Sequence, residues 1–446
     1  MKLSEIDATL REIRVRPVKS LGQNFLHDRN LARWIVDKAG IDRGDFVVEI
    51  GPGLGALTEF VLKAGARVLA IEKDKRLADF LRARFAQESA EIFHQDALEF
   101  NVQTLFAHPR VVLLGNLPYY VASQLLFHYL QYPSPISLSL LMLQKEMAQR
   151  LSAKPRSKAY GALTLLIQLH YHVEYLRTVS SSVFLPQPDV DSALVRLTPR
   201  EESELSPHDY ETFARLVRLG FSQRRKQLGR LLREEIPDWE KAARELEFEP
   251  RARAEELSLE QWLGLSTYSV AGAAAREAKV AEERFAVVDK TDRVTGEAPR
   301  HEVHANNLLH RAVHILLFNP GGEVFLQKRS RWKDRHPALW DSSAAGHVDA
   351  GEEYDQAAQR ELKEELGITA TLERVGKLSA SERTGQEFIW VYRGEANGPF
   401  ALARSEIELG AFFPPKLVTD WIKARPNEFA PGFIECWRLL TEQNRK

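Results

Sequence analysis

The chain has 446 residues, and because domains usually hold about 100–200 residues, two or three domains are expected. Its formal net charge of -1 excludes a uniformly basic nucleic-acid-binding surface, and its single cysteine, Cys436, excludes an intramolecular disulfide and a multi-cysteine zinc site. The first twenty residues lack an apolar centre and no run of about 18 apolar residues follows, so we expect a soluble, cytoplasmic protein that does not enter membranes.

Short β-type runs alternate with helical patterns from Phe46 to Leu197, which predicts a largely parallel α/β sheet flanked by helices. From about residue 206 to 267 these runs stop and helical spacing takes over, which predicts a small helical subdomain. The predicted strands are FVVEI, RVLAIE, EIFHQD, VVLLGN, ISLSLLML, VEYLRTVS and ALVRLTP.

A second domain is expected to begin near Arg284, after a small-residue and charged segment that has little to bury. Its β-type runs FAVVD, AVHILLF, EVFLQKR and EFIWVYRG surround a helical stretch at 353–366, an α+β pattern. The predicted organisation is a first domain at 1–200, a helical subdomain at 201–267, a linker at 268–283 and a second domain at 284–446.

Polar residues stand at four successive strand ends of the first domain. The loop Glu49-Ile50-Gly51-Pro52-Gly53-Leu54-Gly55 follows the first strand, and its glycines permit a tight turn close to a ligand. Glu72 ends the next strand, where a carboxylate can accept ribose hydroxyls, Asp96 ends the third and Asn116 the fourth. This arrangement favours S-adenosylmethionine over a dinucleotide as the cofactor.

The segment Asn116-Leu117-Pro118-Tyr119 suits a flat ring that carries an amino group. The Asn116 side-chain oxygen and the Pro118 carbonyl can accept hydrogen bonds from an exocyclic amine, and Tyr119 offers a face for stacking. A strand that ends in a proline turn is the alternative reading of these four residues.

Seven ordered motifs between about residues 10 and 265 resemble the ribosomal RNA small-subunit adenine dimethyltransferase family. The resemblance implies a class I methyltransferase fold, with a Rossmann-like seven-stranded sheet, that dimethylates N6 of two adjacent adenosines near the 3′ end of small-subunit rRNA. The motifs are KSLGQNFL, EIGPGLGALT, NLPYYVAS, LMLQKEMAQRL, SKAYGALTLLIQ, VFLPQPDVDSALVRL and FSQRRKQL.

The family's site residues carry over onto matching positions of this chain. Phe184, in the later Phe-x-Pro motif, is implied to form a second wall around the target base, opposite Tyr119; a residue of the ordinary core is the alternative reading. Gln187 and Asp189 depart from the family pattern, and an acid at 189 is expected to weaken one phosphate contact. The implied cofactor-binding residues are Asn24, Leu26, Gly51, Glu72, Asp96 and Asn116.

Two groups of basic residues are candidates for contact with RNA phosphates. A solvated helix face is the alternative reading. The first group comprises Arg215, Arg218, Arg224, Arg225, Lys226, Arg230 and Arg233; the second comprises Lys145, Arg150, Lys154, Arg156 and Lys158.

The second domain contains the pattern G-x5-E-x7-R-E-U-x-E-E-x-G-U between Gly346 and Ile368, which resembles a Nudix box. Glu361, Glu364 and Glu365 stand at i, i+3 and i+4, so their carboxylates converge on one helical face. Converging acids suit a hard divalent cation, Mg²⁺ or Mn²⁺, that polarises a diphosphate and activates water. The resemblance implies hydrolysis of a nucleoside diphosphate linked to another group.

Flanking residues resemble the Nudix branch that contains isopentenyl diphosphate isomerase, but the cysteine of that enzyme is replaced by Ala344-Ala345. This favours a hydrolase over an isomerase. An additional metal set is open to His304, His310, His347 and Glu387.

Other functions remain open at this stage. A large-subunit rRNA methyltransferase of the macrolide-resistance type shares some motifs, and either domain could be a binding module, as an assembly checkpoint or as a nonhydrolytic nucleotide sensor. KSLGQNFL and FSQRRKQL favour the small-subunit family. The expected partners are the immature 30S subunit and a nucleoside diphosphate-type molecule, bound by a monomer.

Overall fold

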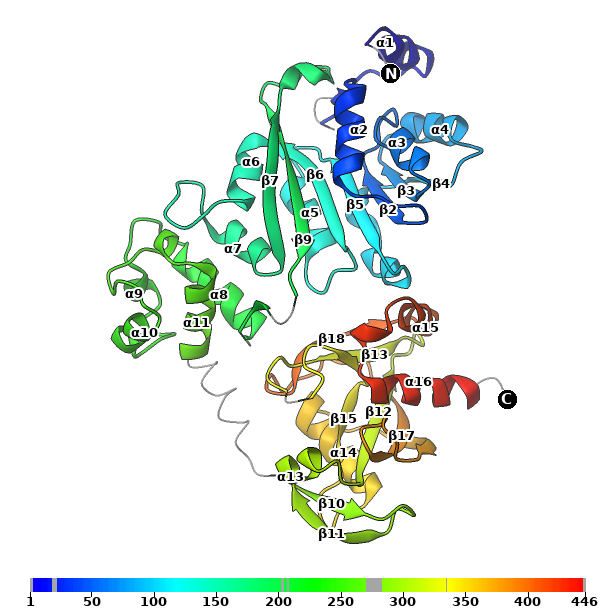
Figure 1. The fold of residues 1–446 in the computed structure, drawn as a ribbon, viewed down its shortest axis with the longest axis vertical. Coiled ribbons are helices and arrows are strands. Elements are labelled where there is room, and N and C mark those ends of the chain that lie inside the picture. The colour runs from blue at the N-terminus through cyan, green and yellow to red at the C-terminus, as the bar shows by residue number, and fades with distance from the viewer. Residues whose placement is uncertain are drawn as a thin grey trace. The chain divides into compact units, whose positions relative to one another are not determined.

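The computed structural model describes residues 3–17, 22–201, 204–206, 208–269, 283–333 and 335–443. Most of the predicted linker (270–282) and Lys19, Ser20 and Leu21 of the first motif lie outside the described residues. The chain forms two compact units (Figure 1). The first comprises Met1–Glu204, Val217–Leu232 and Glu247–Trp262; the second comprises Leu205–Leu216, Arg233–Leu246 and Leu263–Lys446. The helical residues divide between the units, so the predicted domain boundaries stay a prediction.

The first unit is built on a seven-stranded sheet in the order β4-β3-β2-β5-β6-β9-β7. The first five strands run parallel, and β9 lies antiparallel between β6 and β7, so the predicted α/β sheet of the class I methyltransferase type is confirmed. A separate two-stranded sheet pairs β1 with β8. The strands are β1 Phe25–Leu26, β2 Phe46–Ile50, β3 Arg67–Glu72, β4 Ala90–His94, β5 Val111–Asn116, β6 Leu138–Gln144, β7 Tyr171–Val179, β8 Phe184–Leu185 and β9 Ser192–Pro199.

Helices cover both faces of this sheet. Side chains of α2 and α3 pack on one face of the sheet, and those of α5, α6 and α7 pack on the other. Each central strand is therefore buried on both sides. The helices are α1 Leu3–Glu12, α2 Arg29–Lys38, α3 Thr58–Lys63, α4 Lys75–Arg84, α5 Ala122–Leu130, α6 Lys145–Leu151 and α7 Ala162–Gln168, with 3₁₀ turns η2 Ala97–Glu99, η3 Val102–Ala107 and η4 Ser181–Val183.

The segment after this sheet is helical, as predicted. Helical spacing continues through residues 213–236 of the sequence, but the first helix ends at Gly220. A Cβ at Gly220 would lie 2.4 Å from the Trp262 ring, so the chain passes too close to Trp262 for a larger residue. The elements are α8 Tyr210–Gly220, α9 Leu228–Leu231, α10 Trp239–Glu245, η6 Ala254–Glu256 and α11 Leu259–Tyr268.

The C-terminal part is the predicted α+β domain, built around strand β12. This strand pairs with β10, β13 and β15 antiparallel and with β17 parallel. The strands are β10 Arg284–Val288, β11 Val294–Pro299, β12 His310–Phe318, β13 Val324–Arg329, β14 Trp340–Asp341, β15 Ala344–His347, β16 Leu372–Leu378, β17 Glu387–Glu395 and β18 Ile407–Phe413.

Helix α14 packs its apolar face on this sheet. Tyr354, Leu362 and Leu366 are buried against Val313 and Ile315 of β12, which leaves the acidic face of the helix for other contacts. The helices are α13 Arg300–Ala305, α14 Tyr354–Leu366, α15 Pro415–Ala424 and α16 Pro431–Gln443, with a 3₁₀ turn η8 Pro426–Glu428. No helix among the described residues is long and apolar enough to cross a membrane.

Candidate functional site

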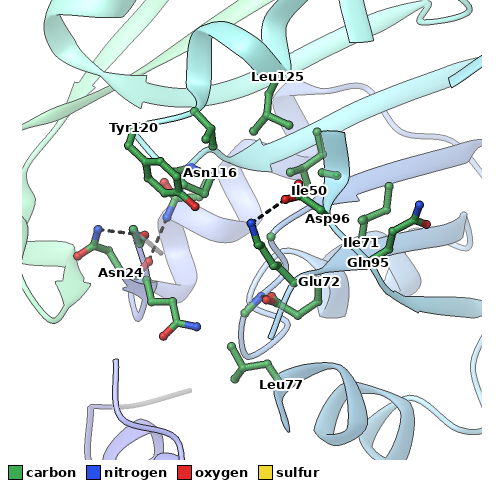
Figure 2. A pocket seen from close by; sticks show the side chains of 18 of the residues that line it. Asn24, Ile50, Ile71, Glu72, Leu77, Gln95, Asp96, Asn116, Tyr120 and Leu125 are labelled. Atoms are coloured by element: carbon green, nitrogen blue, oxygen red, sulfur yellow. Dashed lines mark hydrogen bonds and ion pairs between the residues drawn. The ribbon is translucent and has the colours of Figure 1, made fainter. Parts of the chain in front are cut away.

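A cavity opens at the ends of four neighbouring parallel strands, β4, β3, β2 and β5 (Figure 2). The cavity and its open mouth together have a volume of about 760 Å³, which is enough for a nucleoside-sized ligand. Its lining includes Asn24, Gly51, Glu72, Asp96, Asn116 and Pro118 of the predicted residues. The remaining predicted cofactor residue, Leu26, lines a smaller cavity that shares Asn24, Gly51 and Asn116 with the first.

The glycine-rich turn after β2 forms one wall of this cavity. Gly51 and Gly53 have φ values of 64° and 59°, a left-handed conformation that favours glycine. A Cβ at Gly53 would lie 3.0 Å from the Phe25 ring. The Gly53 N–H donates to Glu72 Oε2 at 3.1 Å, which holds the carboxylate at the end of β3 beside the turn.

Two buried carboxylates lie at this edge of the sheet. Burial raises the pKa of Glu72 to about 7 against the effect of backbone N–H donors, among them that of Asp74. Burial likewise raises the pKa of Glu49 to about 7, and the Thr58 hydroxyl donates to Glu49 Oε2 at 2.6 Å. Glu72 faces the cavity, where hydroxyl donors of a ribose would compensate its burial.

We expect Glu49→Gln to stabilise the fold in a pH-dependent way, because the amide keeps an acceptor for Thr58 without a buried charge. The folded-state pKa of Glu49 exceeds the ordinary carboxyl value, so the wild type loses stability as pH rises from about 4.5 to 7. The gain in the free energy of unfolding should be absent below pH ~4.5 and complete above pH ~7, where it should be on the order of 1–3 kcal/mol. The Tm of the variant and of the wild type, measured at pH 5 and pH 8, tests this expectation. Glu88→Gln, at an exposed glutamate, is the control. An equal change in Tm at both pH values would contradict the raised pKa of Glu49.

The side-chain amide of Asn116 is fixed by the N-terminal segment. Its Nδ2 donates to the Asn24 backbone carbonyl at 3.0 Å, which leaves Oδ1 as the acceptor that faces the cavity. Gly22 lies against the same loop, since a Cβ there would lie 2.9 Å from Pro118 Cβ. The motif at residues 22–26 and the NLPY segment therefore form one structural unit.

The structure separates the predicted aromatic walls from this cavity. Tyr119 is half-buried and its hydroxyl lies 2.8 Å from Ser192 Oγ, while Phe184, the first residue of β8, is 3% exposed and packs in the core. The tyrosine that lines the cavity is Tyr120, 55% exposed (Figure 2). The Pro118 carbonyl accepts the Val121 N–H at 3.2 Å, which occupies one of its two lone pairs. Roles for Tyr119 and Phe184 in base stacking stay predictions.

Asp96 lies two residues beyond β4 rather than at its end. Its Oδ1 caps the turn η2 by accepting the Leu98 N–H at 3.0 Å, and its Oδ2 pairs with Lys73 Nζ at 2.6 Å (Figure 2). The Lys73 pair holds the pKa of Asp96 below its usual range. An adenine amino group would therefore meet an ionised acceptor.

A second cavity, in the C-terminal domain, contains the three predicted acids. Glu361, Glu364 and Glu365 all line it, and they project from one face of α14. Burial raises the pKa of Glu361 to about 7 and that of Glu365 well above the ordinary carboxyl value. Glu364 is exposed. Carboxylates crowded in this way fit a divalent cation, which would favour their ionised forms.

Backbone and side-chain contacts position these acids. Arg360 Nη1 donates to Glu361 at 2.8 Å and to Glu364 at 3.0 Å, while the Ala345 N–H donates to Glu365 at 3.0 Å. A Cβ at Gly346 would lie 2.0 Å from the Glu361 carboxylate. A larger residue at this position would displace the Glu361 carboxylate from where it lies.

Histidines from separate elements meet on the wall of the second cavity. His304 and His347 line it together with Glu387, and His310 is buried beside them. Burial lowers the pKa of His347 to about 3, although Glu387 acts to raise it. Burial acts to raise the pKa of Glu387, but its histidine neighbours hold it well below its usual range.

Comparison with known proteins assigns both domains. Residues 16–270 match the family model described as ribosomal RNA adenine dimethylase, and residues 308–433 match the NUDIX domain. A ribosomal RNA small subunit methyltransferase A from Geobacillus thermodenitrificans is 40% identical over 261 residues, which cover 56% of this chain and 89% of that protein.

The chain belongs to the ribosomal RNA adenine dimethylase family.

Two solved structures are similar to the dimethylase part. A dimethyladenosine transferase from Plasmodium falciparum is 26% identical, with a TM-score of 0.48, and covers 54% of this chain and 95% of its own. The 23S rRNA methyltransferase ErmE is 28% identical, with a TM-score of 0.47, and covers 55% of this chain and 99% of its own.

The prediction that the chain is an enzyme with a methyltransferase domain followed by a Nudix domain is confirmed. The dimethylase family implies S-adenosylmethionine, and the Nudix domain implies a divalent metal ion. Sequence reasoning missed Tyr120, Lys73 and Gln95 in the dimethylase cavity. Tyr120 follows the predicted Tyr119, and Lys73 follows the predicted Glu72. This adjacency in the sequence was the only indication that they could line the cavity.

Proposed function

We propose that this protein transfers methyl groups from S-adenosylmethionine to N6 of two adjacent adenosines near the 3′ end of small-subunit rRNA. The proposed substrate is the immature 30S subunit, and the enzyme acts as a cytoplasmic monomer. The observation that supports this most is the placement of Glu72, Asp96 and Asn116 around one cavity at neighbouring strand ends, within a chain of the adenine dimethylase family. The name of the Geobacillus relative supports the small subunit over the large one.

The residues at the cavity divide into a cofactor side and a base side. Glu72 and Asp96 are acceptors for the ribose and adenine of the cofactor, and the turn at Gly51–Gly53 brings the backbone close to it. S-adenosylmethionine supplies a methyl group bound to a positively charged sulfur. The adenine amine can attack this methyl group without activation by a metal ion, because the positively charged sulfur already makes the methyl group electrophilic.

Asn116 is proposed to activate the adenine amine by hydrogen bonding. The N6 lone pair is delocalised into the ring, so an acceptor that holds an N6 hydrogen favours a pyramidal, more nucleophilic nitrogen. Asn116 Oδ1 is available for this because Nδ2 is committed to the Asn24 carbonyl. The Pro118 carbonyl keeps a second lone pair for the other hydrogen. The remaining contribution is alignment, which can supply up to roughly 7–11 kcal/mol in well-oriented reactions.

Exposed cations in the helical segment and at residues 145–158 support binding to RNA phosphates. Arg215 pairs with Glu235, and Arg150 pairs with Glu146. The remaining side chains of the two predicted groups that are exposed to solvent are Lys145, Lys154, Arg156, Lys158, Arg218, Arg224, Arg225, Lys226, Arg230 and Arg233. Binding that depends on these residues should weaken steeply with salt.

Labelling with a methyl-tritiated donor tests the choice of RNA. We expect the protein to label immature small subunits that lack the modification, and nuclease digestion of that RNA to give N6-dimethyladenosine. Protein-free large-subunit RNA should stay unlabelled. Labelling of the large-subunit RNA without labelling of small subunits would instead support the macrolide-resistance type of enzyme.

For the second domain we propose Mg²⁺-dependent hydrolysis of a nucleoside diphosphate linked to another group. Glu361, Glu364 and Glu365 would hold the cation, which polarises the diphosphate when bound. Two arginines that line the same cavity, Arg335 and Arg383, are suited to contact phosphate oxygens. This proposal is supported by the match to the NUDIX domain and by the burial of two of the acids in its motif.

A further inference from the structure

An open hollow with a basic lining lies beside the dimethylase cavity. With its mouth it has a volume of about 1160 Å³. Lys73 lines both the hollow and the cavity, so the two share part of one rim. None of its cations belongs to the two basic groups predicted from the sequence. The hollow is lined by Arg14, Val15, Arg16, Lys73, Asp74, Lys75, Arg76 and His94.

The segment that follows α1 presents two arginines to this hollow. The Val15 N–H donates to the Leu10 carbonyl at 2.9 Å, and Arg14 has a φ of 55°, so the helix ends in a tight turn. Val15 is 6% exposed and packs in the apolar cluster beneath α1. Arg14 and Arg16, on either side of this buried anchor, are both exposed.

The turn between β3 and α4 supplies most of the remaining lining. Asp74 is the one acid in the lining, and its Oδ1 accepts the backbone N–H groups of Arg76 and Leu77 at 2.9 and 3.2 Å, which caps α4. The Arg76 guanidinium donates to the Arg14 backbone carbonyl. The acid is therefore committed to the helix, and the two parts of the lining are held together.

Carboxylates leave most of the positive charge of the hollow unneutralised. Within the part of the chain that the structure describes, no carboxylate forms an ion pair with Arg14, Arg16 or Arg76. Lys75 pairs with Asp79 at 2.8 Å, but both side chains are exposed, and such pairs contribute little. These cations can therefore neutralise a bound polyanion.

We propose that this hollow binds phosphates of the substrate rRNA next to the target adenosines. The inference rests on the proposed methylation of small-subunit rRNA. RNA carries a negative charge at each nucleotide, which complements the row of cations. An acidic protein has the same sign of charge, but RNA is favoured because its base is the group that the adjoining cavity is proposed to receive.

Neutralising the hollow tests this contact. For the triple variant Arg14→Gln/Arg16→Gln/Lys75→Gln, we expect the Kd for immature small subunits to rise by about 10-fold or more at ~0.1 M salt, and the salt slope of binding to become shallower by about 2. The contact from Arg76 to a backbone carbonyl is kept. Since the three side chains do not line the cavity, the Kd for S-adenosylmethionine and kcat at saturating RNA should be unchanged.

The matched control is Arg33→Gln/Lys38→Gln/Arg43→Gln, which removes the same charge from exposed positions in and after α2, outside the hollow. Equal Kd values and salt slopes for the two triple variants would overturn the inference. Weaker binding to intact subunits but unchanged binding to their protein-free RNA would also overturn it, because the partner would then be an acidic ribosomal protein. Binding is measured without S-adenosylmethionine, so wild-type protein that uses the hollow but does not methylate would contradict the proposed function alone.

A crosslink locates the contact independently of affinity. Cys436 is the only cysteine of the chain and is buried, so Arg16→Cys provides a single accessible thiol for a photoactivatable reagent. We expect this thiol to crosslink to nucleotides that flank the two target adenosines, and Arg43→Cys to give no such crosslink. Crosslinks from Arg16→Cys only to distant nucleotides, or none at all, would overturn the inference.

Discussion

Replacing Asn116 with alanine should abolish methyl transfer while RNA binding stays nearly unchanged. The variant loses the Oδ1 acceptor for the adenine amine, and removing one preorganised hydrogen-bonding group typically costs about 10²–10³-fold in rate. RNA affinity depends mainly on phosphate contacts and should change less than about 3-fold. Single-turnover methylation and a filter-binding titration with the same RNA measure the two effects.

Two control variants separate chemistry from folding. Asn116→Asp keeps an acceptor oxygen but loses the donor to the Asn24 carbonyl, so it should retain more activity than the alanine variant. Asn101→Ala removes an asparagine that caps η3 outside the cavity lining and should methylate normally. Equal losses of RNA binding and methylation in Asn116→Ala would contradict the assigned role.

Glu365→Gln should remove Mg²⁺-dependent phosphate release without harming the fold. The amide oxygen can still accept the Ala345 N–H, but a neutral group no longer binds the cation, and loss of about 10²-fold or more is expected. Because burial disfavours the charged form of Glu365, the variant should unfold at the same or a higher temperature. Phosphate release from a nucleotide library and thermal unfolding provide the two readouts.

The matched control for this variant is Glu373→Gln, an exposed glutamate on β16 outside the cavity. It should release phosphate like the wild type. Unchanged release in Glu365→Gln would exclude the hydrolase proposal and leave a nonhydrolytic sensor as the better explanation of the domain.

The sequence was sufficient for the main sheet and for the strand ends at Glu72 and Asn116, although Asp96 lies beyond the end of its strand. The alternation of apolar runs with helical patterns gives each central strand two buried faces, which only a sheet covered by helices on both sides satisfies. The break after Gly220 was not predicted, because the spacing of apolar residues continues through it. The Trp262 ring, from a distant part of the chain, lies against Gly220 at this end of the helix, and a contact of this kind cannot be read from local spacing.

The two sites were predictable to different degrees. Carboxylates at strand ends and at i, i+3 and i+4 on a helix follow from local geometry, so Glu72 and the acids of α14 could be read from the sequence. Which tyrosine faces the cavity depends on how the turn after β5 is oriented, and neighbouring Tyr119 and Tyr120 are indistinguishable by pattern. The three histidines were named from the sequence as part of a possible metal set, but their convergence from three separate elements follows from no spacing.

The hydrogen bond from Asn116 Nδ2 to the Asn24 carbonyl determines which end of the Asn116 amide faces the cavity. A side-chain amide has two nearly isosteric ends, and a flip of 180° would present an N–H to the adenine amine, donor against donor. The Asn24 carbonyl accepts only a donor, so it selects the productive orientation. A backbone group 92 residues earlier thereby determines whether the end of β5 attracts or repels the target base.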